Sequence, residues 1–154
     1  MALSDFEYMN QALRLALRGR GRTSPNPIVG AIIVSDGVVV GSGYHQEAGS
    51  PHAEVHALRA AGSAAQGATL FCTLEPCCHT GRTGPCVEQI VESGIRRVVV
   101  AVEDPNPLVA RGGISFLRDQ GVQVEVGLCG GEAFQVNRDF FTFIRYNRPF
   151  VTMK

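Results

Sequence analysis

Two short stretches of the sequence concentrate side chains that can do chemistry. The first, "SPHAEVHAL", places His52 and Glu54 directly behind a proline. The second, "TLEPCCHTGRTGPC", contains Cys77 and Cys86, and each of these cysteines follows a proline. One imidazole and two thiolates suit zinc, a borderline-soft ion that accepts nitrogen and sulfur ligands at tetrahedral angles. The residue types therefore predict a zinc site made by His52, Cys77 and Cys86.

A zinc ion with three protein ligands is typical of a catalytic site, because the fourth position stays open for water. Zinc can lower the pKa of that water to roughly 7, so that hydroxide is available at neutral pH. Glu54 lies two residues after His52, and both side chains can reach a site off the end of a helix within its first turn. A carboxylate there can act as a general base and later protonate a leaving amine. Zinc-dependent base deaminases carry His-x-Glu followed by Pro-Cys-x-x-Cys, and this sequence departs from that spacing because eight residues, not two, separate Cys77 from Cys86.

Simpler explanations exist for each part of this pattern. An isolated His-x-Glu pair on a helix is usually a solvated surface pair, and cysteines in a reduced chain commonly pack in the core. The combination of both pairs with their prolines favours a metal site over these explanations. A zinc site could also be a non-catalytic scaffold, in which Cys78 or His79 closes the fourth position.

The predicted elements can bring these residues together. Helices expected over residues 51–61 and 85–93 each open with a proline, which suits the first helical turn. Their N-termini can therefore point free N–H groups and positive dipole ends at one spot. Cys77 follows the buried strand "ATLFCTL" at its carboxyl end, where open α/β sheets bind their ligands.

Hydrophobic periodicity predicts the rest of the fold. The turn "SDG" indicates that the first two strands form an antiparallel hairpin, and strands separated by helices pair in parallel through right-handed crossovers. We therefore expect an α/β protein with three α/β/α layers and a five-stranded mixed sheet whose last three strands are parallel. Further helices are expected over residues 5–18, 108–119 and 132–145, and further strands over 28–34, 37–45, 96–102 and 122–128.

Composition narrows the class of protein. The chain has 154 residues, 45% of them hydrophobic, which suits one domain with a proper core. Lys+Arg and Asp+Glu number 14 each, so the basic charge that nucleic-acid binding needs is missing. The N-terminus lacks the layout of a secretory signal, and no apolar run approaches the ~20 residues of a membrane span. We expect a cytoplasmic protein with no nucleic-acid or membrane partner, whose five cysteines are reduced.

Longer stretches of the chain resemble a known enzyme family. The segments "SPNPIVGAIIV", "GSGYHQEAGSPHAEVHAL", "TLEPCCHTGRTGPC" and "EDPNPLVARGGISFLRDQGVQV" are similar to the deaminase domain of the bifunctional riboflavin-biosynthesis deaminase/reductases. The similarity runs from about Met9 to the end, and the eight residues between Cys77 and Cys86 are its most specific part. The resemblance implies a cytidine-deaminase-like fold, Zn²⁺ on the three predicted ligands, and a proton-shuttle role for Glu54.

The resemblance also implies a substrate and the residues that hold it. The implied substrate is 2,5-diamino-6-(5-phosphoribosylamino)pyrimidin-4(3H)-one, which loses ammonia by hydrolysis in riboflavin biosynthesis. An arginine in the loop between the cysteines suits a phosphate or a ring carbonyl, which it can bind with two N–H groups. The positions that match substrate-contacting residues are Asn26, His45, His79, Arg82, Asp104 and Asn106.

Alternatives and boundaries complete these expectations. Cytidine, guanine and tRNA-adenosine deaminases share the zinc chemistry, but the long spacing between the cysteines and the "DPNP" segment argue against them. Cys78, Gly84 and Arg111 depart from the family pattern, which concerns substrate fit rather than the chemistry. Residues 1–146 are expected to form the deaminase domain and residues 147–154 to begin a linker or a C-terminal reductase domain. We expect a homo-oligomer and no NADPH binding by this chain.

Overall fold

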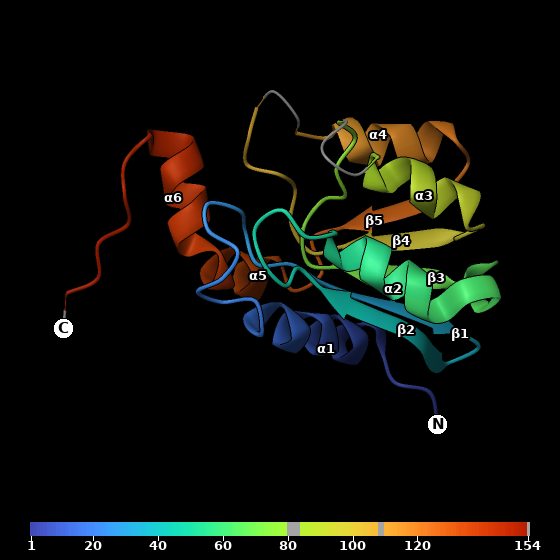
Figure 1. Ribbon diagram of the computed structural model, residues 1–154. Coiled ribbons are helices and arrows are strands. Elements are labelled where there is room, and N and C mark those ends of the chain that lie inside the picture. Colours follow the sequence, from blue (N-terminus) through green and yellow to red (C-terminus); the bar gives the residue numbers. More distant parts are fainter. Residues whose placement is uncertain (80–83, 108–109, 154) are drawn as a thin grey trace.

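The computed structural model describes residues 1–79, 84–107 and 110–153. Figure 1 shows a layered α/β body from which the last helix and the C-terminal segment extend to one side. In chain order the elements are α1 (Asp5–Leu17), β1 (Gly30–Ser35), β2 (Val38–Tyr44), α2 (Ala53–Ala61), a 3₁₀ turn (Gly62–Ala65), β3 (Thr69–Cys72), α3 (Cys86–Glu92), β4 (Arg97–Val100), α4 (Gly112–Asp119), β5 (Gln123–Val126), α5 (Gly130–Val136) and α6 (Arg138–Tyr146).

The five strands form one mixed sheet in the order β2-β1-β3-β4-β5. β1 and β2 make the predicted antiparallel hairpin, and β3, β4 and β5 run parallel as predicted. β1 also pairs antiparallel with β3, with Ala31 opposite Cys72. The segment that leads into β1 therefore lies at the same edge of the sheet as the carboxyl ends of β3 and β4.

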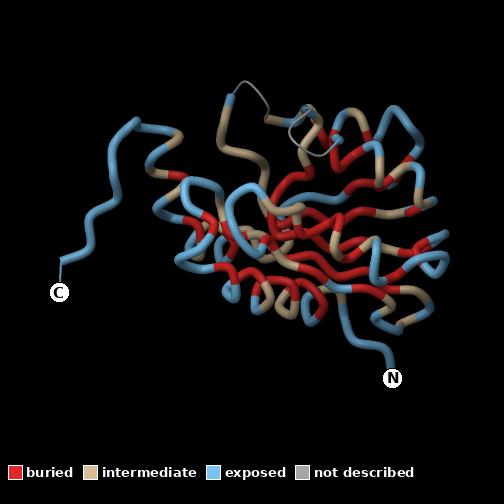
Figure 2. Tube along the Cα trace, in the orientation of Figure 1, coloured by how far each residue is buried: buried red, intermediate tan, exposed pale blue. Residues whose placement is uncertain are grey.

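Helices cover both faces of the sheet, which confirms the three predicted layers (Figure 1). Successive side chains of a strand point to opposite faces, so Ile33 packs in the cluster under α2, α3 and α4 while Ile32 packs in the cluster under α1 and α5. Figure 2 shows the buried residues concentrated in the strands and on the helix sides that face them. No helix in the described ranges is both long and apolar enough to cross a membrane.

Two glycines of β2 bring α2 unusually close to the sheet. A Cβ on Gly41 would overlap the carbonyl oxygen of Ala57, and a Cβ on Gly43 would overlap that of Ala53. Because no larger residue fits at these positions, the first turn of α2 is held directly against the hairpin. This contact fixes where the start of α2 points.

The predicted starts of two helices were slightly wrong. His52 is the N-cap of α2, with an extended ψ of 164°, so Pro51 precedes the helix instead of lying in its first turn. Pro85 is likewise the N-cap of α3, and the helix begins at Cys86. Both metal-ligand candidates therefore lie at the helix ends, where backbone N–H groups are free.

Two predictions in the C-terminal half were also wrong. The helix expected to begin at residue 108 begins at Gly112, because Arg111 has a left-handed φ of 64° that a helix cannot contain. The single helix expected over 132–145 is two helices that break at Asn137. There the Asn137 side chain accepts a hydrogen bond from the Ile28 N–H and donates one to its carbonyl.

Candidate active site

The three predicted zinc ligands meet beyond the end of β3. His52 caps α2, Cys86 opens α3, and Cys77 lies on the segment between β3 and α3. His52 Nδ1 lies 3.2 Å from Sγ of Cys86 and 3.5 Å from Sγ of Cys77. The three ligand atoms all lie within 4.8 Å of one another. Tetrahedral zinc, with bonds of about 2.0 Å to nitrogen and 2.3 Å to sulfur, places its ligand atoms about 3.5 to 3.8 Å apart, so these residues fit the ion.

The local electrostatics also suit a cation. The backbone N–H of Cys86, at the start of α3, points at Sγ of Cys77 over 3.4 Å. The hydrogen bond from the Cys86 thiol lowers the pKa of Cys77 to about 4, and the same bond together with burial raises the pKa of Cys86. These contacts favour the thiolate form of Cys77, which is the form that binds a metal.

Glu54 lies beside these ligands as a buried acid. It is the second residue of α2, with only 3% of its surface exposed. Burial raises the pKa of its carboxyl group to about 7, and the Cys72 thiol on β3 hydrogen-bonds to it. A carboxyl group with a pKa near neutrality can both accept and release a proton at physiological pH.

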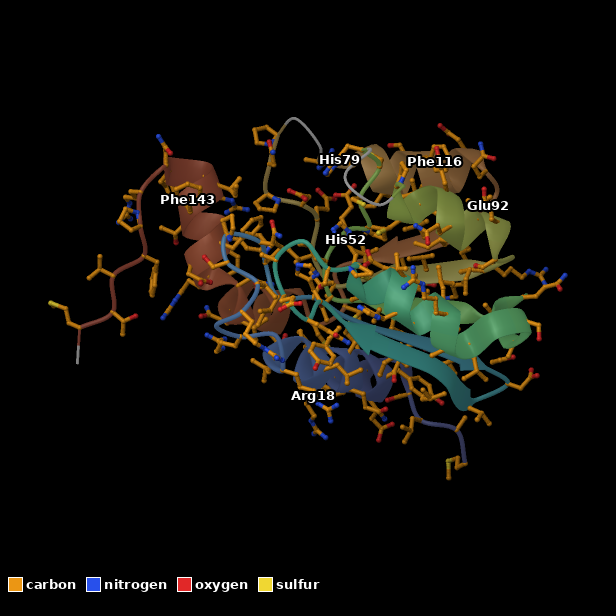
Figure 3. The ribbon with its side chains drawn as sticks, viewed as in Figure 1. Arg18, His52, His79, Glu92, Phe116 and Phe143 are labelled. Atoms are coloured by element: carbon orange, nitrogen blue, oxygen red, sulfur yellow. The ribbon has the colours of Figure 1, made fainter. Side chains whose placement is uncertain are left out.

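A cavity of about 490 Å³ opens onto His52, Glu54 and Cys77. Figure 3 shows His52 at the start of α2, near the middle of the molecule, with His79 above it. The structure brings five of the six predicted substrate-contacting residues to the wall of this one cavity, namely Asn26, His45, His79, Asp104 and Asn106. The sixth, Arg82, lies outside the described residues.

His45 has an unusual position in this wall. It is 3% exposed, and its Nδ1 lies 3.3 Å from the carbonyl oxygen of Pro51. Its Nε2 is buried and has no hydrogen-bond partner among the described residues. Burial lowers the pKa of the imidazole, which favours the neutral ring.

The two residues that a closed zinc scaffold would use are not part of the ligand group. Sγ of Cys78 lies against α4, 2.7 Å from where a Cβ on Gly112 would stand. His79 is exposed and lines the cavity instead. Within the part of the chain that the structure describes, the group of potential metal ligands is His52, Cys77 and Cys86, which leaves the side of the site facing the cavity open.

A family model for the cytidine and deoxycytidylate deaminase zinc-binding region matches residues 3–102. The chain belongs to this deaminase family. It is 55% identical over 150 residues to the riboflavin biosynthesis protein RibD of Aquifex aeolicus, and this alignment covers 97% of the chain and 42% of that protein. It is 51% identical over 152 residues to RibD of Escherichia coli, which covers 99% of the chain and 41% of that protein.

A solved structure of RibD from Acinetobacter baumannii superimposes on the deaminase fold of this chain with a TM-score of 0.93. That match has 49% sequence identity and covers 95% of the chain and 41% of the larger protein. The chain thus spans about two fifths of the length of the relatives it matches. These similarities confirm the predicted resemblance and the cytidine-deaminase-like fold.

The zinc-binding region of the deaminase family does not contain the whole cavity. It includes the three ligand candidates and Glu54 but ends at residue 102. Asp104 and Asn106 follow that boundary, and so do Phe140 and Ile144 of α6, which complete the cavity wall. The far wall is therefore built from the C-terminal part of the chain.

Sequence reasoning missed several residues of this wall, and Glu75, Phe140 and Ile144 are the informative ones. Phe140 and Ile144 were missed because a single helix was expected over residues 132–145, whereas the break at Asn137 redirects α6 along the cavity. Glu75 was missed although it stands in the quoted "TLEPC", because its partners come from residues 104–114. No local pattern signals such distant partners.

The departures from the family pattern have different structural meanings. Arg111 occupies a left-handed conformation that favours glycine, and its exposed guanidinium pairs with Glu103 over 3.1 Å. Gly84 has open space where a side chain would stand, so the structure gives no reason for a glycine there. Neither residue lines the cavity.

Proposed function

We propose that this chain catalyses the hydrolytic deamination of 2,5-diamino-6-(5-phosphoribosylamino)pyrimidin-4(3H)-one. The observation that carries the proposal is the group of His52, Cys77 and Cys86, with buried Glu54 beside it, opening into a cavity of about 490 Å³. About half of the chain's residues are identical to those of proteins named for riboflavin biosynthesis.

In the proposed site, His52, Cys77 and Cys86 hold the zinc ion. When bound, zinc acts as a Lewis acid that lowers the pKa of a coordinated water to about 7 and so supplies a nucleophile at neutral pH. The positive ends of α2 and α3, which open at Ala53 and Cys86, stabilise negative charge at the same place.

Glu54 moves the protons of the reaction. Its carboxylate takes a proton from the attacking water as the new C–O bond forms at the ring carbon that bears the amine. It delivers that proton to the adjacent ring nitrogen, and then carries the proton of the new hydroxyl group to the exocyclic nitrogen. The C–N bond breaks, ammonia leaves and the ring carbon becomes a carbonyl. Burial raises the pKa of this carboxyl group, which strengthens it as a proton acceptor.

The cavity wall holds and orients the pyrimidine. Asn26, Asp104 and Asn106 can hydrogen-bond the polar edge of the ring, because each lines the cavity. His45 also lines the cavity and contributes an imidazole to its wall. We assign the phosphoribosyl group to the side of the cavity lined by His79, whose ring N–H can donate to a phosphate oxygen. Arg82, which lies outside the described residues, is the second candidate that the sequence offers for this group.

Ammonia release tests the proposal. The purified zinc-loaded chain is incubated with the diaminopyrimidine ribotide, and with cytidine and guanine as comparison substrates. Release of ammonia from the ribotide, at a kcat/KM at least about a hundredfold above that for cytidine or guanine, is the expected result. Release from cytidine or guanine alone would overturn the substrate assignment.

A further inference from the structure

Glu75 is a buried carboxylate beside the active site with no part in the proton transfers described above. It lies between β3 and Cys77, is 5% exposed, and contributes to the cavity wall. Among the described residues, no arginine, lysine or histidine forms an ion pair with it. A buried charge without such a partner needs another source of stabilisation.

Four backbone N–H groups supply that stabilisation. Oε2 of Glu75 accepts hydrogen bonds from the N–H groups of Asp104 and Arg111, each at 3.0 Å. Oε1 accepts from those of Gly113 and Ile114, at 3.1 Å and 3.3 Å. Each oxygen therefore serves two donors, which matches the roughly four acceptor sites of a carboxylate.

These donors come from two separate segments. Asp104 belongs to the loop after β4 that forms part of the cavity wall, and its own Oδ1 accepts the N–H of Asn106. Gly113 and Ile114 are in the first turn of α4, whose free N–H groups and positive dipole end favour a carboxylate. Glu75 therefore caps α4 and holds the substrate-facing loop with one side chain.

The same contact extends to the ligand segment. A Cβ on Gly113 would overlap the carbonyl oxygen of Pro76, so α4 packs directly on the peptide that precedes Cys77. The backbone N–H of Glu75 donates to the carbonyl oxygen of Val102 over 3.0 Å, which ties the ends of β3 and β4 together. The metal-ligand segment, the substrate loop and α4 therefore share one anchor.

We propose that Glu75 is a positioning residue that sets the distance between the substrate-contacting loop at Asp104–Asn106 and the metal ligands. The proposal rests on the proposed function, because it assigns Glu75 a role in placing that substrate. Glu75 does not touch the reacting atoms; it acts through the backbone of the loop that it holds.

The substitution Glu75→Gln tests this role because it preserves shape. Whichever way the amide is oriented, its NH₂ group faces two N–H donors and cannot accept from them. The variant is expected to raise KM for the ribotide by about tenfold or more while kcat falls by less than about threefold, since the loop contacts substrate and not the transferred proton. Zinc content is expected to stay at the wild-type level.

A second readout does not depend on activity. Amide hydrogen exchange at Asp104, Arg111, Gly113 and Ile114 is expected to become at least about tenfold faster in Glu75→Gln, while exchange in α2 is unchanged. The control Glu103→Gln removes a nearby carboxylate whose ion-pair partner, within the described ranges, is the exposed Arg111 side chain. It should change neither KM nor exchange at these four amides.

A merely structural role predicts a different outcome. Val98→Ala lowers stability because it truncates a fully buried side chain of β4 and leaves a cavity. If Val98→Ala matches Glu75→Gln in lost stability and in raised KM, or if Glu75→Gln leaves KM and the four amides unchanged, the positioning role is wrong.

If Glu75→Gln does not fold, Glu75→Asp takes its place. An intermediate rise in KM is expected for Glu75→Asp, and an unchanged KM would overturn the positioning role. A wild-type chain that releases no ammonia contradicts the proposed function instead, and the exchange comparison still decides whether Glu75 holds the loop.

Discussion

The metal side and the substrate side of the cavity are held in place by different contacts. On the metal side, His52 caps α2 and Cys86 is the first residue of α3, and both helices pack on the sheet. Gly41 and Gly43 allow α2 to lie directly against it. On the substrate side, Asn26 and Asp104 stand on loops. Those loops are fixed by side chains that bind backbone groups far away in the sequence.

This difference separates two kinds of requirement. The metal side needs particular side chains at helix starts. Substitutions there should therefore remove zinc or turnover and change substrate affinity less. The substrate side needs correctly placed backbone, so substitutions of its anchors should change KM and stability and leave zinc in place. Variants of the two sides should therefore differ in zinc content, kcat and KM.

Zinc removal is expected to have the largest effect. A chelator that strips the ion should bring ammonia release to background, and the thermal midpoint should fall because metal binding to the folded state stabilises it. Zinc content by elemental analysis, the melting curve and the activity are measured on the same samples. Added Zn²⁺ should restore both properties, whereas Mg²⁺ should not, since a set of one imidazole and two thiolates suits the softer ion. Full activity in zinc-free protein would contradict the metal side as described.

Glu54→Gln comes next in size. The amide cannot take up or release the proton, so kcat should fall by about 10² to 10⁴-fold while zinc content and the circular dichroism spectrum stay unchanged. Glu88→Gln, which alters an exposed acid in the first turn of α3, is the matched control and should keep wild-type kcat. A zinc scaffold predicts the reverse result for Glu54→Gln, with every measured function retained.

The sequence predicted the metal side well because its information is local. The ligands and Glu54 are read from residue types, prolines and short spacings, and strand and helix patterns placed them at one edge of the sheet. It predicted the substrate side less well because the decisive contacts are long-range. The break at Asn137 depends on hydrogen bonds to Ile28. The late start of α4 depends on the left-handed backbone at Arg111, whose N–H donates to Glu75. Neither partner is visible in a window of neighbouring residues.

Asn137→Ala tests the substrate side through its second anchor. The Asn137 side chain, 2% exposed, makes two hydrogen bonds to the backbone of Ile28, two residues after Asn26. Their loss leaves both groups of Ile28 without these partners, so the free energy of unfolding should fall by about 2 to 4 kcal/mol. Urea unfolding measures this, and KM for the ribotide should rise more than kcat falls.

Asn10→Ala, which removes an exposed hydrogen bond, is the control for Asn137→Ala. Its amide makes one hydrogen bond to the Phe6 carbonyl at the helix surface. Its loss should cost less than about 0.5 kcal/mol, because surface substitutions of this kind change stability little. Equal losses of stability in the two variants would show that Asn137 is not an anchor of the substrate side. Zinc loss in Asn137→Ala, but not in Asn10→Ala, would show that the two sides are not separately anchored.

Arg111→Gly is expected to have the smallest effect and the opposite sign. The left-handed φ of 64° at Arg111 strains any residue with a Cβ by roughly 1 kcal/mol, whereas glycine adopts it freely. The exposed ion pair with Glu103 is worth little, and glycine also gains freedom in the unfolded chain, so the net stabilisation should be at most about 1 kcal/mol. Arg111→Ala removes the same ion pair but keeps the strain, so it separates the two contributions in urea unfolding. If Arg111→Gly is less stable than Arg111→Ala, the backbone at this position is not strained, and the N–H that it donates to Glu75 is held at no conformational cost.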